Sequence, residues 1–180
     1  MHSKSYRFLT PLIMVLTWAN MEAQTSHPVP RLVVNVTIDQ LRTDYMEAFS
    51  SLFGAGGFNK VMRDGRSYMD AAYPFSHIDR ASAVACIMTG TVPYDNGIVG
   101  EHWMDRKTLR PMYCVDDATC EGWLTSEKYS PVALNVSTVT DELKMATGGR
   151  ALVYSIAPDA DAAILAAGHA ADGAFWIDNA

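Results

Sequence analysis

A run of β-branched residues that ends at an acidic side chain constrains this chain most. Residues 31–38 read RLVVNVTI, and Asp39 follows directly. A run with apolar residues at successive positions predicts a strand covered on both faces, as in the middle of a parallel sheet. Helix-prone segments follow this run, so the partners of the strand must come from later in the chain. The pattern therefore predicts an α/β fold.

Helical and extended patterns continue to alternate along the chain. We expect helices over residues 43–53, 56–63, 80–88, 138–147 and 158–167, and strands over residues 66–72, 151–156 and 173–177. The turn-rich stretch 91–131 fits short strands. This alternation favours a doubly wound, mainly parallel sheet. Ligands of such sheets bind beyond the carboxyl ends of the strands, so Asp39 could coordinate a metal or orient a base there, or simply cap the next helix.

The first residues have the order of a secretory signal peptide. Residues 1–23 begin with basic side chains, continue through an apolar stretch over residues 8–19 and end at the small residue Ala23. The apolar stretch is shorter than the roughly 20 residues that cross a bilayer. We therefore predict an exported protein, periplasmic or secreted, whose mature chain begins at residue 24 and has no transmembrane span. A buried N-terminal helix is the alternative interpretation.

The composition fits a globular chain and argues against one class of partner. Of the 180 residues 49% are hydrophobic, which is enough for one sizeable core. The net charge of −6 and the scattered basic residues argue against a nucleic-acid-binding surface. The three cysteines match no metal-binding spacing. Cys114 and Cys120 form either a local disulfide or two free thiols, and Cys86 is interpreted as a small core residue.

Short motifs in a fixed order carry a family resemblance. They are VTIDQLR at 36–42, ACIMTG with TVPYDNGIVG at 85–100, DELK at 141–144, and the stretch 163–176. Together they resemble the alkaline phosphatase superfamily, in its type I phosphodiesterase/nucleotide pyrophosphatase branch. The resemblance implies that residues 24–180 are the N-terminal part of an alkaline-phosphatase-like α/β domain that is incomplete at its C-terminus. It further implies an exported, metal-dependent hydrolase that acts on small-molecule phosphoric esters.

The resemblance also implies a metal site and a nucleophile. Two zinc ions would clamp the phosphoryl group while a Thr or Ser attacks phosphorus. Asp39 would be one zinc ligand, and the other ligands would come from a longer chain. The family's nucleophile stands ten residues before Gly90, where this chain has Arg80, and a guanidinium cannot attack phosphorus. Ser82 is therefore the candidate catalytic residue, with a first-turn role in satisfying backbone N–H groups as its alternative.

At three more positions the side chain differs in charge from the residue of the family pattern. Glu101 stands where phosphatase-like relatives place an Asn on the phosphate, and Asp159 and Asp161 stand where they carry a Lys-x-Arg pair. Carboxylates at these positions would repel a phosphate monoester. The resemblance therefore implies diesters or other anions as the better substrates.

These departures suggest a second hypothesis and a second function. We hypothesise that Arg80 pairs with Asp39 in place of a metal, and that Glu101, Asp159 or Asp161 shares the guanidinium. The corresponding function is a catalytically silent superfamily member that acts as a binding or envelope-assembly protein. The alternative is that these side chains face solvent and are unrelated. A sulfatase-like relative is a third possibility, although the sulfatase motif is absent.

Overall fold

The computed structural model describes residues 29–177. The predicted signal peptide, residues 1–23, lies outside the described residues. The chain divides after Val33 into two units. The first is described only over residues 29–33, which form neither helix nor strand, and the second, from Val34, holds all the described helices and strands.

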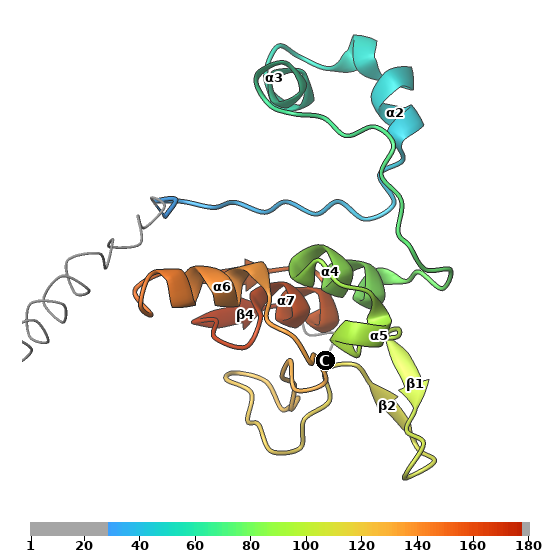
Figure 1. Cartoon of the computed structure of the whole chain (residues 1–180), viewed down its shortest axis with the longest axis vertical. Coiled ribbons are helices and arrows are strands. Elements are labelled where there is room, and N and C mark those ends of the chain that lie inside the picture. The colour runs from blue at the N-terminus through green and yellow to red at the C-terminus, as the bar shows by residue number, and fades with distance from the viewer. Residues whose placement is uncertain (1–28, 178–180) are drawn as a thin grey trace, which may run out of the picture. The chain divides into compact units, whose positions relative to one another are not determined.

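Two helices form the centre of the second unit. α4 (Arg80–Thr89) packs against α7 (Ala160–Ala167) (Figure 1). Small, fully buried side chains, among them Ala81, Ala85 and Ala163, lie on these helices, and small side chains let helices approach closely. The other fully buried apolar residues of the unit are Ile98, Cys114, Val115 and Leu165.

Local hydrogen bonds fix both ends of α4. Asp79 is the N-cap, and its side chain and that of Ser82 form a reciprocal capping box. Gly90 ends the helix in the left-handed conformation, with φ of 68°. The predicted helix over residues 80–88 is confirmed and is one residue longer.

A parallel strand pair carries the α/β pattern. β3 (Tyr154–Ile156) and β4 (Gly173–Phe175) are parallel neighbours, and α7 connects them. The two strands of this βαβ unit lie within the predicted strands over residues 151–156 and 173–177, and both observed strands are shorter than predicted. The helix begins at Ala160, because Asp159 is extended with ψ of 147° and serves as the N-cap.

The turn-rich stretch forms short elements, as expected. α5 (Pro93–Asn96) is followed by β1 (His102–Met104) and β2 (Pro111–Tyr113), which pair as an antiparallel hairpin. In this hairpin Trp103 lies opposite Met112 and His102 lies opposite Tyr113.

The remaining helices differ in burial. α6 (Val139–Ala146) begins at a capping box between Thr138 and Asp141, as their spacing predicts. By contrast, no residue is buried in α2 (Thr43–Ala48), η1 (Ser50–Leu52) or α3 (Gly57–Asp64). Within residues 29–177, none of the helices combines the length and apolar character that crossing a membrane would require.

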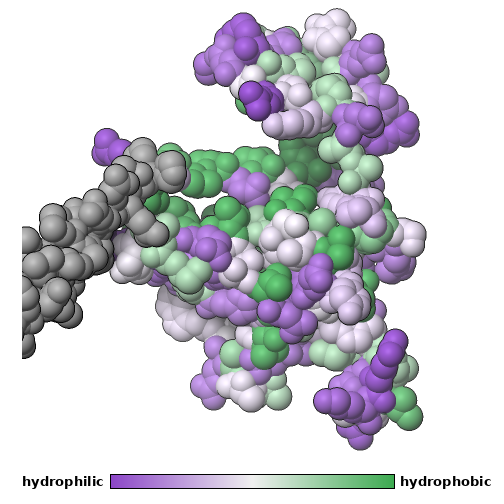
Figure 2. All heavy atoms as spheres, in the orientation of Figure 1, coloured by the Kyte–Doolittle hydropathy of each residue, from purple (hydrophilic) through white to green (hydrophobic). Residues whose placement is uncertain are grey.

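The predicted buried strand over residues 31–38 is wrong for this structure. The segment forms no strand, and its apolar side chains, such as Leu32 and Val36, are largely exposed. The extended segment that follows the grey residues shows hydrophobic surface (Figure 2). A strand exists only when neighbours satisfy its N–H and C=O groups, and no described residue pairs with this one. The predicted strand over residues 66–72 is also absent from the described chain, which bends there.

Candidate functional site

Four of the predicted site residues meet at the N-terminal ends of α4 and α7. The Arg80 guanidinium lies 3.0 Å from Asp161, 3.1 Å from Asp159 and 3.5 Å from Glu101. Its Nε and Nη2 atoms both donate to Asp161, whose side chain is completely buried. We call Arg80, Glu101, Asp159 and Asp161 the Arg80 cluster.

The packing of the two helices explains why residues distant in sequence meet. Arg80 is the first residue of α4, while Asp159 caps α7 and Asp161 lies in its first turn. Arg80 and Asp161 are 81 positions apart along the chain. Because α4 and α7 pack together, these two helix starts face the same site. Glu101 reaches it from the loop that precedes β1.

Asp79 joins this loop to the start of α4. Its Oδ1 accepts hydrogen bonds from the Ser82 N–H and hydroxyl, and its Oδ2 accepts the Glu101 N–H at 2.6 Å. A side chain at Gly100 would place a Cβ 2.9 Å from this Oδ2. The sequence reasoning missed Asp79, although its spacing to Ser82 is that of a capping box and could have identified it.

The charges of the cluster reinforce one another. Partial burial lowers the pKa of Arg80, but the bonds and charges of Asp161, Asp159 and Glu101 outweigh it and raise the pKa above its ordinary value. The Tyr113 hydroxyl accepts the Asp161 N–H at 3.2 Å, and burial together with the Asp161 charge raises the pKa of Tyr113. The tyrosine is therefore a neutral neighbour of a carboxylate-rich site, and no motif or spacing in the sequence points to it.

Ser82 and Asp39 lie in different surroundings. Ser82 is fully buried, and its Oγ is 2.8 Å from Asp79 Oδ1 and 3.0 Å from the Asp79 backbone nitrogen. This is the first-turn role named as its alternative, while its role as nucleophile stays a prediction. Asp39 is exposed in a turn and forms no ion pair with any described residue.

The hypothesis about Arg80 holds in one part and fails in the other. The pair with Asp39 is not formed, because the buried Asp161 takes two nitrogens of the guanidinium. The proposed sharing with Glu101, Asp159 and Asp161 is observed, with all three as partners. The four residues thus form one contiguous site rather than unrelated surface positions.

The described residues do not fit a metal centre by themselves. Within residues 29–177, no three His, Cys, Asp or Glu side chains gather to hold a metal ion. The carboxylates of the Arg80 cluster surround a guanidinium instead. The three cysteines are free thiols, so Cys114 and Cys120 form no disulfide in this structure.

Comparison with known proteins assigns the chain to a family. Residues 33–178 match the family model described as type I phosphodiesterase / nucleotide pyrophosphatase, and the chain belongs to this family. The match covers most of the described residues and agrees with the order of motifs in the sequence.

Two of the individual relatives are alkaline phosphatases. The chain is 40% identical over 153 residues to alkaline phosphatase PhoV of Synechococcus elongatus, which covers 83% of this chain and 28% of the relative. It is 32% identical over 177 residues to alkaline phosphatase PafA of Elizabethkingia meningoseptica, covering 96% of this chain and 32% of the relative. The chain spans about a third or less of the length of these relatives.

A solved structure supports the fold. The crystal structure of wild-type PafA superimposes with a TM-score of 0.79 at 35% identity, over 84% of this chain and 30% of PafA. The structure of a PafA mutant with four substitutions gives a TM-score of 0.72. The predicted alkaline-phosphatase-like α/β fold is therefore confirmed.

Proposed function

We propose that the protein is an exported, metal-dependent hydrolase of phosphoric esters. The observation that carries this proposal is the family match over residues 33–178, supported by the similarity to alkaline phosphatases. Two zinc ions are part of the proposal through family resemblance, with Asp39 as one ligand. Any further ligands would lie outside the described residues.

The charges of the Arg80 cluster support a preference among substrates. Three carboxylates surround one guanidinium, which leaves a net negative site. A monoester phosphate carries up to two charges and a diester one, so repulsion disfavours the monoester more strongly. We therefore propose small-molecule phosphodiesters, or other anions with a single charge, as substrates.

Ser82 is the proposed nucleophile. Asp79 Oδ1, which lies 2.8 Å from Ser82 Oγ, is the carboxylate placed to accept the proton of the hydroxyl. Attack of Ser82 Oγ on phosphorus would break the bond to the ester's leaving alcohol, while the hydroxyl proton passes to Asp79. Since Ser82 is fully buried, this requires the first turn of α4 to open and Ser82 Oγ to give up the bond from the Asp79 N–H while it keeps its contact with Asp79 Oδ1.

The Arg80 cluster also supports a second candidate function. A guanidinium stands where the family pattern has its nucleophile, and three carboxylates engage it. A site filled in this way suits a catalytically silent member that acts as a binding or envelope-assembly protein. Similarity to alkaline phosphatases supports the hydrolase over this alternative.

One assay separates the two functions. The full-length gene product, supplied with Zn²⁺, is tested on bis(4-nitrophenyl) phosphate and on 4-nitrophenyl phosphate. The hydrolase proposal predicts turnover of the diester that Ser82→Ala abolishes and that Ser137→Ala leaves unchanged, since Ser137 is an exposed serine bonded to Glu142. Absence of turnover of both esters by a folded protein would support the silent alternative.

Two further measurements address metal and export. Elemental analysis of the full-length product should find zinc, and Asp39→Ala should reduce the amount bound. Unchanged zinc content in that variant would remove Asp39 from the proposed ligands. N-terminal sequencing of the exported protein should begin at residue 24, and an intact Met1 would contradict the proposed signal peptide.

A further inference from the structure

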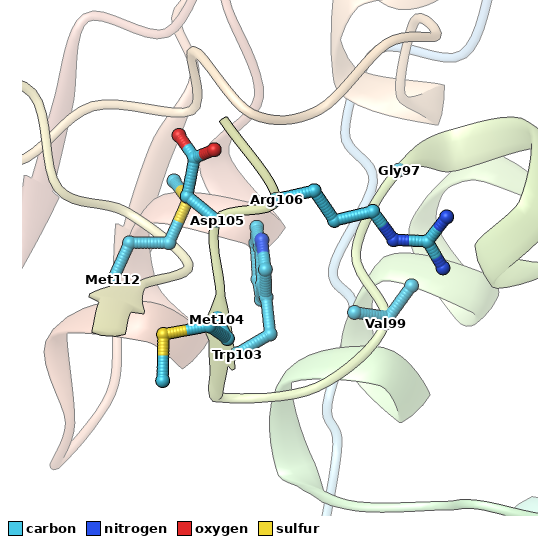
Figure 3. Close-up of a pocket in the computed structure, with 7 residues that line it drawn as sticks. All are labelled: Gly97, Val99, Trp103, Met104, Asp105, Arg106 and Met112. Carbon is cyan, nitrogen blue, oxygen red and sulfur yellow. The ribbon is translucent and has the colours of Figure 1, made fainter. Parts of the chain in front are cut away.

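We propose that a cavity beside the β1–β2 hairpin binds a small molecule with a flat apolar body and an anionic group. The cavity has a volume of about 490 Å³ and lies between the hairpin and the loop that joins α5 to β1 (Figure 3). Small-molecule sites commonly occupy about 300–1,000 Å³. This inference does not depend on the proposed hydrolase activity.

The apolar walls come from neighbouring positions of the hairpin and the loop. Trp103 and Met112 are directly paired across the two strands, so their side chains share one face of the hairpin. Met104 and Val99 complete the apolar lining, and Figure 3 shows the Trp103 indole between the methionines and Val99. Methionine side chains adapt to irregular shapes and pack well on aromatic rings. The lining therefore suits a planar, apolar ligand body.

The polar side chains of the cavity lining are those of Arg106, Trp103 and Asp105, of which the first two are hydrogen-bond donors and the third is an acceptor. Arg106 and Trp103 are lining residues, and within residues 29–177 neither the guanidinium of Arg106 nor the indole N–H of Trp103 has an acceptor or ion-pair partner. Asp105 Oδ1 accepts the backbone N–H groups of Lys107 and Thr108 at 2.6 and 3.2 Å. Donors without acceptors favour a ligand that brings its own acceptors, and Arg106 favours one that is negatively charged.

The local charge supports an anion. The hairpin turn, residues 105–110, reads DRKTLR and carries three basic side chains against one acidic one. The whole chain, in contrast, has a net charge of −6. An anion that is repelled from most of the protein surface is therefore attracted to this turn.

The turn holds the lining in place without a ligand. The Asp105 N–H donates to the Arg110 carbonyl at 2.9 Å, and the Leu109 N–H donates to the Asp105 carbonyl at 2.8 Å. A site that is already formed loses little entropy on binding. The opposite face of the hairpin carries His102 stacked on Tyr113, which contacts the Arg80 cluster through Asp161. Binding in the cavity is thus measurable separately from chemistry at the cluster.

The test uses 1-naphthoate as the anionic probe and 1-naphthalenemethanol as its uncharged counterpart. Isothermal titration of the full-length protein should show tighter binding of the acid. Arg106→Gln should weaken naphthoate binding by about fivefold, the effect of losing one exposed ion pair, and leave the alcohol unaffected. Arg110→Gln is the matched control, because it removes the same charge from the same turn at a position outside the lining.

A second measurement places the probe. The Trp103 indole N–H resonance should shift on addition of naphthoate, and Trp103→Phe should keep the apolar wall while removing this donor. Equal affinity for the acid and the alcohol, or equal losses in Arg106→Gln and Arg110→Gln, would overturn the proposal. Absence of naphthoate binding at about 10 mM to the folded protein would overturn it as well.

Discussion

Removal of the Arg80 side chain should destabilise the protein strongly. Asp161 is completely buried and its carboxylate receives three hydrogen bonds from the guanidinium, so Arg80→Met leaves a buried charge without a partner. Removal of one partner of a buried ion pair lowers the free energy of unfolding by about 3–5 kcal/mol. Because the Arg80 side chain is itself 27% exposed, we expect the lower end, about 3 kcal/mol. For a chain of this length that loss lowers Tm by about 6–12 °C.

A double-mutant cycle isolates the ion pair. Chemical denaturation of the wild type, Arg80→Met, Asp161→Leu and the double variant gives the four free energies of unfolding. The double variant should lose only about 1 kcal/mol, because an apolar pair often replaces a buried ion pair at little cost. Asp159→Asn is the control, since this partner is 45% exposed and its loss should cost less than about 1 kcal/mol. A double variant that loses the sum of the two single losses would refute the reasoning.

Three other predictions follow from local contacts. Gly100→Ala should cost about 1–3 kcal/mol, because the added methyl meets Asp79 Oδ2, which holds the Glu101 N–H; urea denaturation measures the loss. Ionised Asp141 should stabilise the protein above about pH 4. Burial raises the pKa of Asp141, but hydrogen bonds from Thr138, His169 and Ala170 outweigh it and lower the pKa to about 2. About 2 kcal/mol of the free energy of unfolding should therefore be lost as the pH falls from 5 toward 1. Thiol titration of the denatured, unreduced protein should find three reactive cysteines.

Each of these predictions has its own control. Gly54→Ala adds a methyl into open space and should leave the stability near that of the wild type; equal losses at the two glycines would contradict the contact argument. Asp141→Asn should remove about 2 kcal/mol of the pH dependence between pH 5 and 1 and leave the part due to other carboxylates whose pKa is lowered, such as Asp79 and Asp172; a pH profile identical to that of the wild type would contradict this assignment. A titre of one thiol in place of three would indicate a disulfide between Cys114 and Cys120.

Local sequence signals predicted the helices well. The start of α6 at Thr138 and the end of α4 at Gly90 depend on hydrogen bonds between residues only a few positions apart. The local sequence is therefore sufficient to predict these two helix ends. The run over residues 31–38 behaves differently, because a strand depends on distant neighbours that its own residues do not specify. Its apolar pattern alone could not show whether a partner is present.

The candidate site was predicted as a set of positions but not as a geometry. Motif spacing selected Arg80, Glu101, Asp159 and Asp161, and the packing of α4 on α7 joins them. The expected pair with Asp39 failed because the family pattern assigns Asp39 and Arg80 to the same site but does not determine which carboxylate the guanidinium reaches. The burial of Asp161, which decides that choice, is a tertiary property.

The most direct test of the proposed function is the ratio of kcat/KM for bis(4-nitrophenyl) phosphate to kcat/KM for 4-nitrophenyl phosphate, measured on the full-length, zinc-supplied protein. The carboxylates of the Arg80 cluster predict a ratio above one in the wild type. They also predict a smaller ratio in Asp159→Asn, because one repulsive charge is gone. A wild-type protein that prefers the monoester, or a ratio that Asp159→Asn leaves unchanged, would contradict the proposed role of the cluster.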